Sequence, residues 1–270
     1  MDASSPILLF DTGVGGLTVY DALRRVLPDV PIIFAADYAG MPYGKKTEAE
    51  VAARVAGLLG RMSERYRPRL ACIACNTAST IALGMVRDVL EIPIVGTVPA
   101  IKPAALGTKT GVIGLLGTQA TIRQRYVDDL ERDFAGGKTL LRHAAPDLVD
   151  EAENKLRGKP ANRDVLKAAL EGVSDGDKGI SLDRIVLGCT HFPLLREELM
   201  DVAVFDLGMP PDIQLIDGAD GIARRIASLL DGQDFAPTIP NRFVVKGDVK
   251  AATGLEAALA ARDLGPAEPF

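Results

Sequence analysis

Residues 6–27 read PILLFDTGVGGLTVYDALRRVL, and this stretch predicts the fold class of the chain. Its first part, residues 6–10, is a continuous apolar run, as expected for a strand that is covered by helices on both faces. A glycine-rich turn follows, and residues 17–27 then have the apolar spacing of an amphipathic helix. A strand that leads through a short turn into a helix is the repeating unit of α/β proteins with parallel sheets.

The same alternation continues along most of the chain. Further strands are predicted at residues 31–36, 69–74, 93–97, 111–116, 183–187, 213–216 and 243–245. Helices are predicted at residues 47–66, 77–90, 119–134, 162–173, 192–201, 217–231 and 250–262. We therefore expect an α/β fold of mainly parallel sheets flanked by helices.

Two parts of the sequence echo one another, which indicates two similar domains. FDTG at residues 10–13 has a counterpart in LGT at residues 116–118, and IACNT at residues 73–77 has one in LGCTH at residues 187–191. Proline-containing linkers at residues 99–109 and 201–212 suggest two crossings between the domains. We predict a discontinuous first domain of residues 1–98 and 208–270, a second domain of residues 99–207, and an active site in the cleft between them.

Composition excludes several classes of protein. The chain has 270 residues, of which 36 are acidic and 31 basic, so its net charge of −5 gives no electrostatic case for nucleic-acid binding. There is no apolar run of the roughly 18 residues that a membrane span needs, and the N-terminus lacks the pattern of a secretory signal. Three cysteines are an odd number for a disulfide scaffold, so we expect a reducing cytoplasm.

The glycine-rich turn, DTGVGG at residues 11–16, fits neither common nucleotide motif. The dinucleotide fingerprint needs glycine at position 18, where Thr18 stands, and the sequence contains no G-x-x-x-x-G-K-[ST] phosphate loop. We expect the backbone N–H groups at this helix start to hold a small carboxylate. The negative charge of Asp11 would repel such a carboxylate, so we expect Asp11 either to contact an ammonium group of the ligand or to transfer a proton.

The three cysteines fall into two kinds. Cys72 and Cys75 are three residues apart on a predicted strand, so their side chains are expected on opposite faces, with Cys72 a small buried hydrophobe. A zinc or redox site built from Cys72, Cys75 and Cys189 is the alternative from another class. Cys75 and Cys189 each end an apolar strand and precede a predicted helix, whose N-terminus lowers the pKa of a thiol.

Two matched thiols favour proton transfer over acyl transfer. A Cys–His protease uses one thiolate and one imidazole, which leaves the second cysteine without a role. Proton exchange at a stereocentre needs a base on one face and an acid on the other, and the two groups exchange roles when the reaction runs backwards. Cys75 and Cys189 supply such a pair.

Five motifs together resemble the glutamate racemase family. They are FDTGVGGL at residues 10–17, PYG at 42–44, ACNTAS at 74–79, VGTVPAIKPA at 95–104 and LGCTHFP at 187–193. They occur in the family's order, and the resemblance covers residues 7–231. It implies a cofactor-independent racemase that interconverts L- and D-glutamate for peptidoglycan synthesis, with two α/β domains and no metal. It also implies glutamate as the small-molecule partner, a homodimer, and neither a nucleic-acid nor a membrane partner.

The resemblance also assigns roles to residues of this chain. Cys75 resembles the thiol that takes the α-proton of D-glutamate and Cys189 the thiol that takes that of L-glutamate, with Asp11 assisting the first and His191 the second. The residues implied in substrate binding are Asp11, Thr12, Tyr43, Gly44, Asn76, Thr77, Thr118, Thr121, Thr190 and His191.

A further acid of the family lies in a short segment that aligns with residues 145–153. Glu153 fits its place best, although Asp150 and Glu151 stand close enough to compete for it. His143 is interpreted as structural or solvated, and Lys45 and Lys46 as a solvated rim. Within this superfamily, an aspartate racemase or another amino-acid racemase is the alternative, because it shares both thiols and differs in the length of its pocket.

Overall fold

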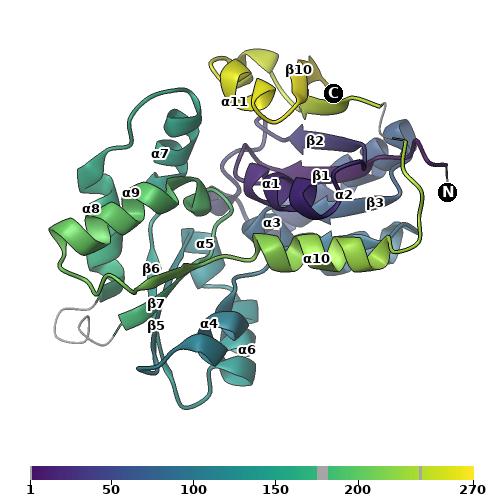
Figure 1. Cartoon of the computed structure of the whole chain (residues 1–270). Coiled ribbons are helices and arrows are strands. Elements are labelled where there is room, and N and C mark those ends of the chain that lie inside the picture. Colours follow the sequence, from purple (N-terminus) through teal and green to yellow (C-terminus); the bar gives the residue numbers. More distant parts are fainter. Residues whose placement is uncertain (1, 175–181, 237–238) are drawn as a thin grey trace. The chain divides into compact units, whose positions relative to one another are not determined.

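The computed structural model describes residues 2–174, 182–236 and 239–270, and its contacts divide the chain into two compact units (Figure 1). The first unit comprises Met1–Thr97 and Ala219–Phe270, and the second comprises Val98–Gly218. Each unit contains one sheet whose described strands all pair in parallel. The predicted fold class, parallel-sheet α/β with flanking helices, is confirmed in both units.

The first unit is built on six strands in the order β10-β9-β2-β1-β3-β4. They are β1 (Ile7–Asp11), β2 (Ile32–Ala36), β3 (Leu70–Ile73), β4 (Ile94–Gly96), β9 (Asn241–Val245) and β10 (Leu264–Pro269). The helices are α1 (Leu17–Val26), α2 (Glu48–Tyr66), α3 (Asn76–Val89), α10 (Ala219–Leu229) and α11 (Glu256–Ala260), with 3₁₀ turns η1 (Tyr43–Lys45) and η5 (Val249–Ala252). Helices α1 and α10 lie side by side, and α2 packs along α3 (Figure 1).

The second unit is built on four strands in the order β6-β5-β7-β8. They are β5 (Val112–Gly117), β6 (Thr139–Ala144), β7 (Leu182–Leu187) and β8 (Gln214–Ile216). The helices are α4 (Ile101–Gly107), α5 (Gln119–Ile122), α6 (Arg125–Phe134), α7 (Asp147–Leu156), α8 (Arg163–Ser174) and α9 (Arg196–Asp201). A 3₁₀ turn η3 (Phe192–Leu195) precedes α9, and a π-type turn η4 (Val202–Asp206) follows it.

The two sheets share one strand order, which explains the echo in the sequence. In the first unit β2-β1-β3-β4 are neighbours, and in the second β6-β5-β7-β8 take the same places. In the first unit, β2 lies on one side of β1 and β3 on the other. In the second unit, β6 and β7 lie on either side of β5 in the same way. The loops after β1 and β3, and those after β5 and β7, therefore flank a switch in strand order, where open α/β sheets bind ligands.

Apolar side chains cover both faces of each sheet. Every residue of β1, β2 and β3 is buried, as the continuous apolar runs predict. In the first unit, Phe10 and Ile73 pack against α2 and α3. In the second, Leu187 packs toward α7, α8 and α9, whereas Leu115 and Val186 pack against α4 and α6. Burial of both faces fixes the strands, and with them the loops at their carboxyl ends.

Several elements differ from the sequence prediction. Strands β6 and β10 are missing from it, because both lie at sheet edges: β6 is only partly buried, and β10 contains two prolines, which an edge strand tolerates. Helix α4 lies where a linker is predicted, and it accommodates Pro103 because this residue is in its first turn, where the missing N–H costs nothing. Helix α7 was also missed, and the predicted helix at 119–134 is broken between α5 and α6.

The second crossing between the units lies later than the predicted residues 207 and 208. Strand β8 pairs in parallel with β7, so the segment up to Gly218 packs with the second unit and the first resumes at Ala219. Separately, none of the helices in the described ranges combines the length and apolar character needed to cross a membrane.

Gly16 gives a test of how closely the β1–α1 turn packs on β3. A Cβ at Gly16 would lie 2.9 Å from the Ala74 Cβ and 3.2 Å from the Asp11 Cβ. We predict that Gly16→Ala lowers the free energy of unfolding by about 1–3 kcal/mol, because overpacking displaces these neighbours. Urea unfolding measures the change.

The matched control is Gly57→Ala, in the exposed face of α2, where a Cβ would meet no atom within 4 Å. It should raise stability by about 0.5–1 kcal/mol through helix propensity. Equal midpoints for Gly16→Ala and the unsubstituted protein would contradict the close packing.

Candidate active site

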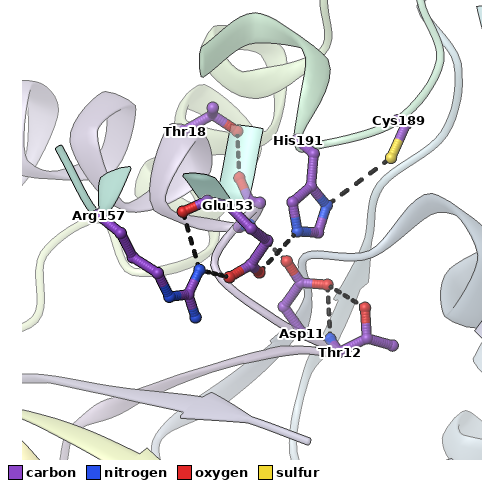
Figure 2. A network of polar contacts seen from close by, with 9 residues as sticks. Asp11, Thr12, Thr18, Glu153, Arg157, Cys189 and His191 are labelled. Atoms are coloured by element: carbon purple, nitrogen blue, oxygen red, sulfur yellow. Dashed lines mark hydrogen bonds and ion pairs between the residues drawn. The ribbon is translucent and has the colours of Figure 1, made fainter. Parts of the chain in front are cut away.

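Asp11 organises the first half of the candidate site. It is the last residue of β1 and is fully buried. Its Oδ1 accepts the Thr12 N–H at 2.6 Å (Figure 2), and its Oδ2 accepts the Gly16 N–H at 2.5 Å. Two of the N–H groups that the sequence assigned to a ligand carboxylate are therefore bound to Asp11 itself. The prediction that this turn cradles an anion through its backbone is corrected to that extent.

Cys75 occupies the position that the sequence predicts, at the start of a helix. It is the N-cap residue of α3, in extended conformation, and 7% of it is exposed. Asn76 and Thr77 form the first turn and are buried. In the part of the chain that the structure describes, the buried Asn76 Oδ1 accepts no hydrogen bond. An orphaned acceptor beside a thiol at a helix N-terminus indicates a position for a ligand donor.

Cys72 lies on the face of β3 opposite to that of Cys75. Ala71, Ile73 and Cys75 all belong to the core cluster under α2 and α3, so the alternation along β3 turns Cys72 to the opposite face. Burial raises the pKa of the Cys72 thiol to about 12, and the negative charge of Asp11 adds to the rise. Among the described residues no group of three or more His, Cys, Asp or Glu side chains is placed to hold a metal ion.

Tyr43 is held by two residues that the sequence analysis missed. Its hydroxyl donates to Asp37 Oδ2 at 2.6 Å, and Arg54 Nη2 donates to Asp37 Oδ1 at 2.6 Å. Burial raises the pKa of Tyr43 above its usual range, and the negative charge of Asp37 raises it further, so the phenol stays protonated. Asp37 directly follows β2, and this position at a strand's carboxyl end is the signal that could have found it. Gly44 is partly buried beside Tyr43.

In the second unit, Cys189, His191 and Glu153 form a chain of polar contacts. The Cys189 Sγ lies 3.8 Å from His191 Nδ1, and His191 Nε2 lies 3.1 Å from Glu153 Oε1 (Figure 2). All three residues are at least nine-tenths buried, and so is Thr190, which lies between Cys189 and His191 in the sequence. A carboxylate that accepts from Nε2 leaves Nδ1 to exchange a proton with the thiol.

The surroundings of Cys189 differ from those predicted. The sequence placed it before a helix at residues 192–201, but the thiol is followed by the 3₁₀ turn η3, with His191 as its N-cap, and only then by α9. The Phe192 N–H donates to the Cys189 carbonyl at 3.0 Å. A single 3₁₀ turn has a much smaller dipole than an α-helix, so the imidazole of His191 is the nearer influence on this thiol.

Among the three candidate acids, only Glu153 contacts His191 in the described residues. Asp150 is exposed, and Glu151 accepts the Asn162 N–H at 2.7 Å. The Thr118 and Thr121 hydroxyls lie 3.0 Å apart at the start of α5, directly after β5. The ring of His143 fills the space beside Gly172, which agrees with a structural residue. Lys45 and Lys46 are exposed.

A family model described as "Asp/Glu/Hydantoin racemase" matches residues 13–226. The chain belongs to this racemase family. It is 60% identical over 229 residues to a glutamate racemase of Sphingopyxis alaskensis, which covers 85% of this chain and 83% of the relative. It is 43% identical over 225 residues to the glutamate racemase of Escherichia coli K12, covering 83% of this chain and 76% of that protein.

Solved structures agree with this family assignment. The crystal structure of Escherichia coli glutamate racemase in complex with L-glutamate and the activator UDP-MurNAc-Ala has a TM-score of 0.90 and 39% identity, covering 98% of both chains. The Bacillus anthracis racemase isoform RacE1 has a TM-score of 0.82 and 26% identity, covering 100% of this chain and 98% of that one. The resemblance that the five motifs predict is confirmed.

The burial of the thiols predicts an order of alkylation. Cys72 is fully buried and, with a pKa of about 12, is thiolate in fewer than about one molecule in 1,000 at pH 8.5, whereas Cys75 and Cys189 are each 7% exposed. We expect iodoacetamide to label Cys75 and Cys189 well before Cys72 in the folded protein, with the sites mapped by mass spectrometry. All three should react alike in urea. Equal labelling of Cys72 in the folded chain would contradict its assignment.

Proposed function

We propose that this chain racemises glutamate and that Cys75 and Cys189 are its two acid–base groups. The observation that carries the proposal is their equivalent placement: each follows the strand beside the first strand of its unit, β3 beside β1 and β7 beside β5. Each thiol is followed by two buried polar residues, Asn76-Thr77 or Thr190-His191. Two related half-sites, each with a thiol, supply the two bases that inversion of a stereocentre requires.

In the proposed reaction both thiols act on the Cα of one glutamate. Cys189 as thiolate removes the α-proton of L-glutamate, and Cys75 as thiol delivers a proton to the opposite face of the planar carbanion. For D-glutamate, Cys75 is the base and Cys189 the acid. Each thiol returns to its starting state in the reverse turn, so the reaction consumes no cofactor.

The neighbours of the two thiols support different parts of this cycle. His191 lies on Cys189 and is held by Glu153, so it takes up or returns the thiol proton. Asp11 ends β1, and Cys75 follows the neighbouring strand β3. The Asp11 carboxylate accepts N–H groups of its own turn, and in the proposed reaction it assists the Cys75 thiol. The pairing of β1 with β3 aligns Phe10 with Ile73, which brings the ends of both strands together.

In the proposed complex, the substrate is bound by polar groups from both units. The orphaned Asn76 Oδ1 is a suitable acceptor for the α-ammonium group, and the Thr118 and Thr121 hydroxyls are suitable donors to a carboxylate. Thr12, Tyr43, Gly44, Thr77 and Thr190 complete the proposed binding set. Glutamate is the substrate proposed, since two glutamate racemases are 60% and 43% identical to this chain.

The biological setting is proposed on the same basis. D-Glutamate made by the chain would enter peptidoglycan synthesis. The reaction needs free thiols, and all three cysteines are free, which supports a reducing cytoplasm. The homodimer that the resemblance implies is carried forward as part of the proposal.

The function is tested by incubating the protein with each enantiomer of glutamate and following optical rotation. We expect both samples to converge on zero rotation, because the two enantiomers have equal free energy. L-Aspartate and D-aspartate are the comparison substrates. Faster racemisation of aspartate than of glutamate would favour the other amino-acid racemases of the family, and no change with any of the four would contradict the proposal.

Replacement of single thiols tests the assignment of faces. Cys75→Ser and Cys189→Ser should each slow racemisation by about 10²–10⁴-fold, because a serine hydroxyl is too weak an acid and base at neutral pH. Elimination of HCl from 3-chloroglutamate needs only removal of the α-proton, and its product hydrolyses to 2-oxoglutarate. The Cys75 variant should therefore still process the L form, and the Cys189 variant the D form.

The matched control is Cys72→Ser, a replacement on the same strand as Cys75 but on the other face. It should lower stability and leave turnover close to that of the unsubstituted protein. If the folded Cys72 variant is as inactive as the other two, the wrong thiols have been paired.

A further inference from the structure

Arg157 lies at the far end of the contact chain that leads to Cys189. It is the C-cap residue of α7, and its side chain turns back onto the helix. Its Nη1 donates to Glu153 Oε2 at 2.6 Å and to the Glu153 carbonyl at 2.8 Å (Figure 2). One guanidinium nitrogen therefore binds both the backbone and the carboxylate of the same glutamate. This double contact fixes the rotamer of Glu153 as well as its charge.

The two oxygens of Glu153 have different partners. Oε2 accepts from Arg157, and Oε1 lies 3.1 Å from His191 Nε2. Only 6% of Glu153 is exposed, and burial alone disfavours an ionised carboxylate. A charge-assisted hydrogen bond from the guanidinium offsets this effect and keeps Glu153 an acceptor. As an acceptor, Glu153 requires the proton of a neutral His191 to be on Nε2.

The position of that proton decides what His191 can do for the thiol. With the proton on Nε2, the lone pair of Nδ1 faces the Cys189 Sγ at 3.8 Å and can accept its proton. If Glu153 became protonated, its O–H would donate to Nε2 and the imidazole proton would move to Nδ1. Nδ1 would then be a donor, and Cys189 would lose the base that converts it to thiolate.

From these contacts we infer that Arg157 is a positioning residue for deprotonation by Cys189. It acts through Glu153 and His191. The inference rests on the proposed function in one respect, namely that Cys189 is the base for the L enantiomer. It adds a residue that the sequence motifs do not contain, and it confines the effect of that residue to one of the two thiols.

A second contact, made by Lys155, holds α7 in place independently of the Arg157 side chain. Lys155 Nζ donates to the Leu194 carbonyl at 2.8 Å and lies 2.7 Å from Glu198 Oε1, so it ties α7 to η3 and α9. His191 is the N-cap of η3, and we therefore expect it to keep its distance from α7 when Arg157 is replaced. The predicted effect of a replacement is a change in Glu153 and not a displacement of the helix.

The kinetic test compares elimination of HCl from L- and D-3-chloroglutamate by the full chain. We expect Arg157→Gln to lower the ratio of the L rate to the D rate by about 10–100-fold, by analogy with the loss of the outer partner that orients a metal-bound histidine. Arg157→Lys restores the charge but not the planar guanidinium group, and it should recover part of the ratio. An unchanged ratio in both variants would overturn the inference.

The matched control is Arg163→Gln. Arg163 also belongs to the second unit and also forms a close pair with a carboxylate, Asp206, at 2.6 Å, but this pair is exposed, at the start of α8 and the end of η4. It should leave the L to D ratio unchanged. An equal fall in the ratio for Arg163→Gln would show that any lost ion pair in this unit has the same effect, and would overturn the specific role of Arg157.

A measurement without substrate separates this inference from the proposed function. The chain has two histidines, so the ¹⁵N resonances of His191 are assigned by comparison with His143→Gln. At a pH where the imidazole is neutral, we expect the Nε2–H tautomer in the unsubstituted protein and a shift toward Nδ1–H in Arg157→Gln.

The two readouts lead to distinct conclusions. His191 shifts that do not change in Arg157→Gln would overturn the inference, whatever the rates. If the unsubstituted protein fails to process glutamate and 3-chloroglutamate, the proposed function is wrong, and the tautomer measurement still decides the role of Arg157. If Arg157→Gln does not fold, Arg157→Lys is used for both readouts.

Discussion

Parallel pairing of neighbouring strands is the constraint on which both half-sites depend. Because β1 and β3 run in the same direction, Asp11 and Cys75 lie at the same edge of the sheet, where the two strands end. The pairing of β5 with β7 does the same for Thr118 and Cys189. Buried apolar faces on both sides of each sheet hold this register, since a slip would expose core side chains.

The proposed half-sites share a topology but differ in the surroundings of their thiols. Cys75 caps a fourteen-residue helix, whose N-terminal dipole favours a thiolate. Cys189 precedes only a 3₁₀ turn and instead has an imidazole at 3.8 Å, backed by Glu153. The proposed reaction needs comparable acid–base strength on both faces of the substrate, and the helix dipole and the imidazole are two different physical means of supplying it. Sequence similarity between the halves does not reveal this difference.

Local patterns in the sequence predict what depends on neighbours along the chain. The apolar runs of β1 and β3, the helix start after Cys75 and the opposite orientation of Cys72 all follow from spacing. Edge strands such as β10 were missed because they lack that apolar pattern. Arg54 and Arg157 were missed because they act through a carboxylate, Asp37 or Glu153, whose position is set by tertiary packing. The sequence placed Glu153 beside Asp150 and Glu151, and only the fold of α7 separates them.

The central claim is that two separate thiols exchange protons with one substrate carbon. Racemisation of L-glutamate in D₂O tests it most directly, with the hydrogen content at Cα of the D product measured by mass spectrometry during initial turnover. The proton delivered by Cys75 comes from solvent, so the account predicts one deuterium at Cα of the product and none in the remaining substrate. A product that keeps the original hydrogen would show that one base removes and returns the same proton, and would contradict the account.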